Sequence, residues 1–477
     1  MSSHKTKIVC TIGPASRSPQ MLEALIKAGM NVARLNLSHG DFLEHKKDIQ
    51  NIRQVSQKLK EPVSILIDLP GVKMRIGKLK EKEIFLKRDE IVTLTTKNVL
   101  GTISLIPVSY KRLAHSVVKG GIIYLNDGFI QLRVEKIVGE DIRCKVVIGG
   151  RLLSNKGLNL PGAKLFIDPI TKRDLEIIDF GLKNGVSVFG LSFVEKARDI
   201  IRVREFAKKR GKEIYLVAKI ERKAAIDNFD EILAVTDGVM VARGDLGIET
   251  PIEQVPVVQK GLIRKANLAG RPVITATQML GSMTYNVRPT RAEVNDVANA
   301  VLDGTDAIML SEETAIGEYP IETVGMMRKI AHSAECLYHN DQLFNDIRSQ
   351  VKDRTHHENV TVSNTVSLNV VEAINKLNVK FILTQTSSGS TARHISRLKP
   401  HCWLLAFSSY RETCEFLVFS YGVYPVFMKK IIKNYPEVIV RDIRKKKMIS
   451  QGDSVIITER RFSSRPGDTD SLGIITL

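Results

Sequence analysis

The stretch Val217-Ala218-Lys219-Ile220-Glu221 ends an apolar run with a lysine and a glutamate two residues apart. Side chains at positions i and i+2 of a β-strand point to the same side, so Lys219 and Glu221 are expected to face one cavity. A later apolar run ends in Arg243-Gly244-Asp245. An isolated Lys-x-Glu is most often an ordinary ion pair, but the second acid changes this interpretation. Glu221 and Asp245 together suit Mg²⁺ or Mn²⁺, which complete their coordination with water and substrate oxygens.

Apolar runs and helical patterns alternate on both sides of this stretch. Helical spacing follows each apolar run, and parallel strands need such crossover connections. The predicted strands are 7–12, 31–37, 63–69, 186–193, 214–220, 238–242, 272–277 and 306–311. Eight strands with eight helices predict an α/β fold, a (β/α)8 TIM barrel, whose chemistry lies at the C-terminal ends of the strands.

Two further parts of the chain depart from this alternation. A strand-rich insertion follows the third strand, and it would emerge at the barrel mouth as a small β-barrel lid domain that excludes water. A C-terminal α/β domain follows a polar linker at 345–360. The predicted boundaries are 1–70 and 163–342 for the barrel, 71–162 for the lid and 355–477 for the C-terminal domain.

Polar residues gather at the expected barrel mouth. Arg34, Asn36 and Ser38 alternate along the second strand and therefore face the cavity together. The planar fork of an arginine suits a phosphate or a carboxylate. Two other residues have alternative interpretations: Thr277 would bind a substrate carboxylate or its own backbone, and His39 is equally well a packed or capping histidine.

The C-terminal domain contains a hydroxyl-rich turn, Thr386-Ser387-Ser388-Gly389-Ser390-Thr391, which opens a helix. Such a turn at a helix N-terminus is a ready anion site. With Arg460, Arg461 or Arg465 it would receive a phosphorylated allosteric effector: a sugar phosphate, a sugar bisphosphate or a nucleotide monophosphate. A plain helix cap is the alternative interpretation.

The composition argues against several other classes of protein. The formal charge of +19 is spread over 477 residues and only 6% of them are aromatic, which favours small phosphorylated ligands over nucleic acid. No apolar stretch is long enough for a membrane span, and the N-terminus lacks a signal-peptide core. Five scattered cysteines argue against a disulfide framework. We therefore expect a cytoplasmic enzyme with no nucleic-acid or membrane partner.

Several segments, taken in order, resemble the pyruvate kinase family and together cover nearly the whole chain. They are KIVCTIGPAS from Lys7, NVARLNLSHG from Asn31, NKGLNLPG from Asn155, AKIE from Ala218, MVARGDLGIE from Met240, ATQML from Ala276 and RPTRAEVNDVANAVLDGTDAIMLSEETA from Arg288. The resemblance implies a catalytic A domain, a B domain lid and a C domain for effectors and subunit contacts, in a homotetramer. It also implies transfer of phosphoryl from phosphoenolpyruvate to ADP, giving pyruvate and ATP in the last step of glycolysis.

By that resemblance, Lys219 and Arg34 would hold the moving phosphoryl group, and Glu221 and Asp245 would bind Mg²⁺. The backbone N–H groups of Gly244 and Asp245, with catalytic Thr277, would bind the substrate carboxylate.

Four residues match nucleotide-contacting positions of the family: Arg75, Lys156 and, more loosely, Asn36 and His39. The proton donor to the enolate stays open; a relay through Thr277, Ser311 and Glu313 is one hypothesis.

One departure from the family pattern concerns K⁺. Where most members read Asp-Thr-Lys-Gly-Pro-Glu-Ile-Arg, this chain reads Asp68-Leu69-Pro70-Gly71-Val72-Lys73-Met74-Arg75. Asn36, Ser38 and Asp68 match the family's K⁺ ligands, and Leu69 would offer its carbonyl. Lys73 replaces the glutamate typical of K⁺-dependent members, and its ammonium would supply the missing charge. We predict activity without K⁺.

Two rival functions stay open from the sequence. A Mg²⁺-dependent pyruvate or phosphoenolpyruvate lyase on a barrel would share the two acids but would need neither the lid nor Arg75 and Lys156. The second rival is a catalytically silent homologue that only binds effectors. The sequence disfavours it, because every residue expected to touch the substrate or the metal is present.

Overall fold

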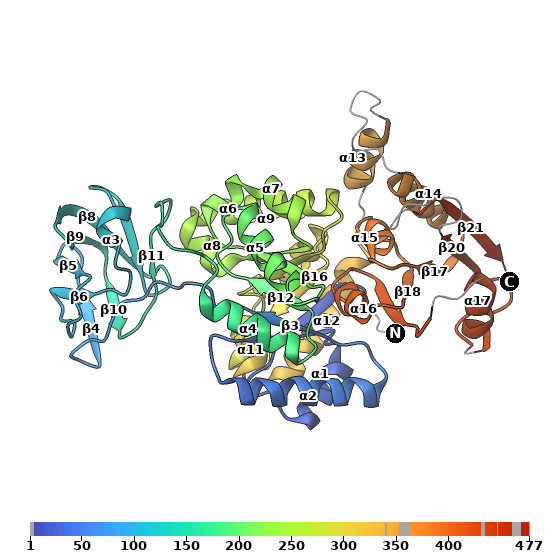
Figure 1. The fold of residues 1–477 in the computed structure, drawn as a ribbon, viewed down its shortest axis with the longest axis horizontal. Helices are drawn as coiled ribbons and strands as arrows, with labels where there is room; N and C mark the ends of the chain where they lie inside the picture. Colours follow the sequence, from blue (N-terminus) through green and yellow to red (C-terminus); the bar gives the residue numbers. More distant parts are fainter. Residues whose placement is uncertain are drawn as a thin grey trace.

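The computed structural model describes residues 4–338, 341–352, 362–430, 435–445, 447–459 and 469–476. A barrel lies in the middle of the molecule, with the strand-rich insertion on one side and the C-terminal domain on the opposite side (Figure 1). Over these residues, no helix has both the length and the apolar character that crossing a membrane requires.

Eight parallel strands form the closed barrel, in the order β1-β16-β15-β14-β13-β12-β3-β2, which confirms the predicted fold. They are β1 (Lys7–Thr11), β2 (Val32–Asn36), β3 (Ser64–Asp68), β12 (Val188–Leu191), β13 (Tyr215–Ile220), β14 (Gly238–Ala242), β15 (Val273–Ala276) and β16 (Ala307–Leu310). Several strands are buried over their whole length, β14 for example, because helices cover the outside of the barrel and side chains fill its inside.

The helices around the barrel bury apolar faces against the strands. They are α1 (Pro19–Ala28), α2 (Phe42–Leu59), α4 (Lys172–Lys183), α5 (Ala197–Lys208), α6 (Lys223–Asp227), α7 (Phe229–Val235), α8 (Arg243–Glu249), α9 (Val255–Leu268), α10 (Arg291–Leu302), α11 (Glu312–Ala315) and α12 (Pro320–Glu335), with short 3₁₀ turns η1 (Ile252–Gln254) and η2 (Gly281–Thr284). Local signals set their ends: Asp41 and Glu44 form a capping box at the start of α2, and Gly29, at φ 136°, ends α1. The helical segment that follows the strand predicted at 214–220 is divided into two helices, α6 and α7.

The insertion after β3 has its own apolar core. Its elements are β4 (Glu83–Leu86), β5 (Ile91–Thr95), β6 (Leu105–Pro107), α3 (Leu113–Ser116), β7 (Ile122–Leu125), β8 (Ile130–Val138), β9 (Asp141–Ile148), β10 (Gly150–Leu153) and β11 (Leu158–Asn159). β4 and β5 are separate strands because the chain turns between them at Asp89, whose φ is 70°. Its described strands pair as a six-stranded sheet, β11-β7-β8-β9-β5-β6, and a two-stranded sheet, β10-β4, and so do not close into one ring.

The C-terminal domain is a five-stranded sheet in the order β19-β18-β17-β20-β21, with helices on its faces (Figure 1). Its elements are α13 (Asp341–Lys352), α14 (Val362–Lys376), β17 (Val379–Gln385), α15 (Ser390–Ser396), β18 (Trp403–Ser408), α16 (Arg411–Leu417), β19 (Val423–Phe427), α17 (Tyr435–Lys445), β20 (Ser454–Glu459) and β21 (Ser471–Thr476). The first part of the expected polar linker is helix α13, since its apolar side chains Leu343 and Ile347 pack against α14 and its neighbours.

Side chains of α16 and the turn after it close the barrel at the end opposite its mouth. Phe416 and Phe419 join the cluster of barrel-filling residues, and the Phe416 ring stacks on Tyr215 with centroids 4.4 Å apart. A buried ion pair, Lys399 Nζ to Asp306 Oδ1 at 2.7 Å, also joins the two domains. The C-terminal domain is therefore packed against the barrel, at the end away from the C-terminal ends of its strands.

Candidate active site

The predicted site residues lie at the C-terminal ends of the barrel strands. Arg34 and Asn36 lie in β2 and Asp68 ends β3; Lys219 lies in β13 and Glu221 follows it; Thr277 follows β15. Arg243-Gly244-Asp245 was expected to end a strand, but it forms the first turn of α8. This matters because the first N–H groups of a helix have no partner within that helix and favour an anion.

Lys219 is the centre of a buried ionic network. Its Nζ lies 3.0 Å from Glu221 Oε1 and 3.1 Å from Asp68 Oδ1, and it donates to Ser192 Oγ at 2.7 Å. Burial lowers the pKa of Lys219, but the two carboxylates outweigh burial and hold that pKa above its usual value. The lysine is therefore a fixed positive charge at the barrel mouth.

Asp68 is shared between two cations. Arg34 donates from Nε to Asp68 Oδ2 at 2.7 Å and from Nη1 to Thr11 Oγ1 at 2.9 Å. Burial raises the pKa of Asp68, but Lys219 and Arg34 outweigh it, so this pKa lies below its usual range. The carboxylate thus orients both cations toward the same mouth.

Glu221 and Asp245, the two residues predicted to bind a metal ion, are close enough for their charges to interact. Burial raises the pKa of Glu221, and the negative charge of Asp245 adds to this effect, although Lys219 opposes it. Glu221 Oε2 also accepts from the Phe193 N–H at 2.8 Å. Two neighbouring carboxylates whose charges repel fit a divalent cation, which would neutralise them.

The protein supplies few further ligands at this position. The described residues contain no group of three or more His, Cys, Asp or Glu side chains arranged to hold a metal ion. A cation on Glu221 and Asp245 would therefore keep positions for water and substrate oxygens, as Mg²⁺ prefers.

A turn beside α8 places the Thr277 hydroxyl next to the helix start. Gly244 N–H donates to Thr277 Oγ1 at 2.9 Å, and that hydroxyl donates to the Ala276 carbonyl at 2.7 Å. Thr277 and Gln278 have φ values of 68° and 53°, which non-glycine residues adopt rarely and mostly where the surroundings impose it. The Thr277 hydroxyl thus does bond to the neighbouring backbone, as the alternative interpretation expected, and it also lies at the barrel mouth beside the start of α8.

Arg243 imposes this turn and was given no role from the sequence. Its Nη2 donates to the Thr277 carbonyl at 2.7 Å, and its Nη1 donates to Asp296 Oδ1 at 2.7 Å. The guanidinium is buried. Ser192 was missed in the same way, because its contact with Lys219 joins β12 and β13 through space and leaves no pattern in the sequence.

Of the four residues predicted to contact the nucleotide, the structure brings Arg75 and Lys156 together. Arg75, on the segment that leaves the barrel, pairs with Gly157 in an isolated antiparallel bridge and donates from Nη1 to the Asn155 carbonyl at 2.9 Å, which places it beside Lys156 in the lid turn between β10 and β11. Asn36 Oδ1 accepts from the Ser38 N–H at 3.2 Å. His39 is exposed in the loop after β2.

The residues matched to a monovalent site have other partners here. Both carboxylate oxygens of Asp68 face cations, and the Leu69 carbonyl accepts from Ser192 Oγ at 2.6 Å. Lys73 Nζ lies 3.5 Å from Asp245 Oδ1 and 3.7 Å from Asp127 Oδ1 of the lid. The lysine therefore reaches the acidic side of the mouth rather than Asp68.

The hypothetical proton relay and the effector turn are also in the described residues. Glu313 is buried and accepts from the Ser311 and Leu280 N–H groups at 2.6 and 3.3 Å. In the C-terminal turn, Thr386 Oγ1 accepts from the Gly389 N–H at 2.9 Å, and Gly389 has φ 76° before α15. Arg460, Arg461 and Arg465 lie outside the described residues.

The fold and the mouth define the class as a (β/α)8-barrel protein with buried cationic and acidic side chains gathered at the ends of its strands. Comparison with known proteins specifies it further. Residues 3–324 match the family model "Pyruvate kinase, barrel domain", and residues 364–475 match "Pyruvate kinase, alpha/beta domain".

Named relatives agree with both family models. The chain is 48% identical to a pyruvate kinase of Thermococcus litoralis, over 100% of this chain and 99% of that protein. It is 44% identical to a pyruvate kinase of Staphylococcus saprophyticus, over 98% of this chain and 80% of that protein. The crystal structure of a pyruvate kinase from Cryptosporidium parvum superposes with a TM-score of 0.90 at 35% identity, covering 99% of this chain and 96% of that one. The chain belongs to the pyruvate kinase family and is a phosphotransferase, which confirms the predicted resemblance.

Proposed function

We propose that the chain transfers a phosphoryl group from phosphoenolpyruvate to ADP, forming pyruvate and ATP. The observation that carries the proposal is the position of Lys219, buried between Asp68 and Glu221 and next to Arg34 at the barrel mouth. Phosphoryl transfer needs little covalent chemistry from a protein; it needs positioned charge. A buried ammonium with a raised pKa supplies such charge where water is excluded.

The charges at the mouth explain why a divalent cation belongs to the mechanism. The three cations Lys219, Arg34 and Lys73 face the three carboxylates Asp68, Glu221 and Asp245, so no positive charge is left over for the phosphate of a substrate. Mg²⁺ or Mn²⁺ held by Glu221 and Asp245 would supply the positive charge that stabilises phosphate and enolate oxygens.

The remaining roles follow from position. Arg34 and Lys219 bind the phosphoryl oxygens; the first N–H groups of α8, at Gly244 and Asp245, with Thr277, bind the substrate carboxylate. Arg75, on the segment that leaves the barrel, and Lys156, in the lid turn between β10 and β11, contact the nucleotide phosphates, together with Asn36 and His39 at the end of β2 and in the loop after it. Lid movement brings these groups together and excludes water.

Nucleotide dependence tests the proposal. Purified protein with phosphoenolpyruvate and Mg²⁺ should form pyruvate and ATP in equal amounts when ADP is present, and almost no pyruvate when ADP is left out. Pyruvate formation without ADP would favour the lyase instead. Asp245→Asn should raise the Mg²⁺ concentration that gives half-maximal activity, whereas an unchanged value would contradict its role as a ligand.

The proposal extends to regulation and assembly. The turn 386–391 would bind a phosphorylated effector, and the C-terminal domain (355–477) would carry effector and subunit contacts, beside a barrel (1–70, 163–342) and a lid (71–162). Activity against phosphoenolpyruvate, measured with sugar phosphates, sugar bisphosphates and nucleotide monophosphates, should shift with one of them and lose that shift in Ser388→Asp, which adds a repelling charge. Light scattering should give four times the 53.3 kDa chain mass.

A further inference from the structure

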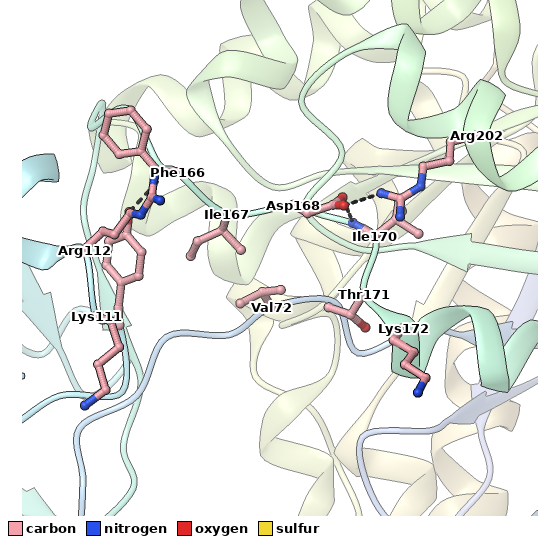
Figure 2. Close-up of a pocket in the computed structure, with 11 residues that line it drawn as sticks. Val72, Lys111, Arg112, Phe166, Ile167, Asp168, Ile170, Thr171, Lys172 and Arg202 are labelled. Atoms are coloured by element: carbon pink, nitrogen blue, oxygen red, sulfur yellow. Dashed lines mark hydrogen bonds and ion pairs between the residues drawn. The ribbon is translucent and has the colours of Figure 1, made fainter. Parts of the chain in front are cut away.

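A cavity of about 520 Å³ lies where the lid, the two segments joining it to the barrel, and the barrel itself meet. Its walls come from Val72 on the outgoing segment, from 110–112 of the lid, from the returning segment at 166–170, and from α4 and α5 of the barrel (Figure 2). None of the residues assigned above to substrate, metal or nucleotide lines it. We call it the hinge pocket.

The middle of the hinge pocket is apolar. Val72 and Ile167 lie between its two ends in Figure 2. Phe166 is 44% exposed, which is high for a phenylalanine, and its ring is 5.8 Å from the Arg112 guanidinium and 5.7 Å from Lys164 Nζ. An exposed aromatic ring flanked by cations favours contact with an apolar or aromatic group that also carries negative charge.

Both ends of the hinge pocket are basic. Lys111 and Arg112 lie at the lid end, and Lys172 and Arg202 lie on the barrel side, apart from each other (Figure 2). Asp168 is the one acidic residue in the lining, and it pairs with Arg202. Lys111 donates to the Thr96 carbonyl, which is neutral. Within the described chain, Arg112 and Lys172 have no carboxylate at ion-pair distance, so each end carries uncompensated positive charge.

The barrel end also includes the start of a long helix. α4 spans 12 residues from Lys172, and Thr171 caps it by accepting from the Asp174 N–H at 3.0 Å. The Asp174 carboxylate accepts from the Thr171 N–H and Oγ1 at 2.8 and 2.6 Å and so offsets the positive end of the helix dipole, which leaves Lys172, among the described residues, as the unpaired cation at this end. A volume of about 520 Å³ is within the range of sites for small organic molecules.

We propose that the hinge pocket binds an elongated organic dianion, with an apolar or aromatic middle against Val72 and Ile167 and one acidic group at each end. Arg112 contacts the group at the lid end, and Lys172 contacts the group at the barrel end. Because one end belongs to the lid and the other to the barrel, the bound dianion links the two and restricts rotation of the lid. By reciprocity, ligands that move the lid change the affinity of the pocket.

Binding of biphenyl-4,4′-dicarboxylate, measured by calorimetry on the full chain, tests the proposal. We expect one saturable site whose affinity falls with ionic strength, with biphenyl-4-carboxylate weaker and the neutral biphenyl-4,4′-dimethanol weaker still. Arg112→Gln and Lys172→Gln should each weaken the dicarboxylate by about tenfold or more, since each removes a charged contact.

Control variants separate the pocket from general attraction to a basic protein. Arg133→Gln removes an exposed lid arginine outside the pocket and should leave affinity unchanged; Arg112→Lys should retain most of it. The proposal is overturned by the absence of saturable binding, by equal affinity for the neutral diol, or by equal losses in the Arg133 and Arg112 variants. The expected slowing of turnover by bound dianion rests on the proposed function. Binding does not, so an inactive chain that still binds dicarboxylate would reject that function and keep this site.

Discussion

The ammonium of Lys219 lies 3.1 Å from the Asp68 carboxylate, and both side chains are almost completely buried at the barrel mouth. Asp68 comes from β3 and Lys219 from β13, two strands that flank β12 in the barrel. The pair holds a positive charge at a fixed point in a dry site, and the acid is simultaneously bound by Arg34. Asp68 therefore fixes the positions of two cationic side chains, Lys219 and Arg34.

Replacing Lys219 by methionine should abolish most turnover while leaving Mg²⁺ binding nearly intact. The loss of a positioned charge in the transition state is worth several kcal/mol, or roughly a thousandfold in kcat. Steady-state kinetics and metal titration measure the two effects. Near-normal turnover in a folded Lys219→Met variant would remove the role given to this lysine.

The charge of Lys73 should make the enzyme independent of K⁺. Activity in buffers free of monovalent activators should be within about tenfold of activity with K⁺, whereas Lys73→Glu should require K⁺. Lys73→Gln is the matched control that removes the charge without reversing it. Because Lys73 Nζ lies near Asp245 and Asp127, its effect is expected to act through the acidic side of the mouth. If removing K⁺ lowered the activity of the parent protein by more than about tenfold, the prediction would be refuted.

Thr277→Val should weaken substrate carboxylate binding and raise KM, because valine cannot accept from the Gly244 N–H or donate to a carboxylate. Thr277→Ser keeps the hydroxyl and should stay within a few fold of the parent. The unusual backbone at φ 68° is held from outside by Arg243, so the serine variant tests the hydroxyl rather than the turn. Equal kinetics of the valine and serine variants would contradict the assignment.

Stability should rise with pH because of Lys7. Burial lowers the pKa of Lys7 from 10.5 to about 7, and its Nζ donates to the neutral Val423 carbonyl at 2.8 Å. The unfolded chain therefore binds the additional proton between these pKa values. Burying the charged form of Lys7 lowers the free energy of unfolding, and this loss is at its full value below pH 7. The free energy of unfolding then rises as pH increases from about 7 toward 10.5, by up to about 1.4 kcal/mol per pH unit.

Lys7→Met should consequently unfold at higher denaturant concentration than the parent at pH 7, and the difference should shrink by pH 10. Lys399→Met is the contrast, because it leaves the buried Asp306 carboxylate without its lysine and should destabilise the chain by several kcal/mol. Equal pH dependence in the parent and the Lys7→Met variant would show that Lys7 is charged in both states.

The barrel and the main site residues could be predicted because their signals are local. Strand and helix periodicity repeat within short windows, and the spacing of Lys219 and Glu221 already places both on one side of a strand. The turn at Asp89 and helix α13 were missed because one depends on a single left-handed residue and the other on packing against α14.

The sequence alone thus determined three things: the order of strands and helices, the lysine and acids at or near the strand ends, and the membership of a family. Each of these depends on neighbours along the chain. Which partner each charged group has was decided by the tertiary structure. Several contacts join residues that are far apart in sequence. Asp68 binds Lys219 and Arg34, and Lys73 lies near Asp245 and Asp127. Arg243 fixes the turn at Thr277, and the hinge pocket brings basic residues of the lid and the barrel to its two ends. Such contacts depend on barrel closure and on where the lid returns to the barrel, and no local pattern encodes them.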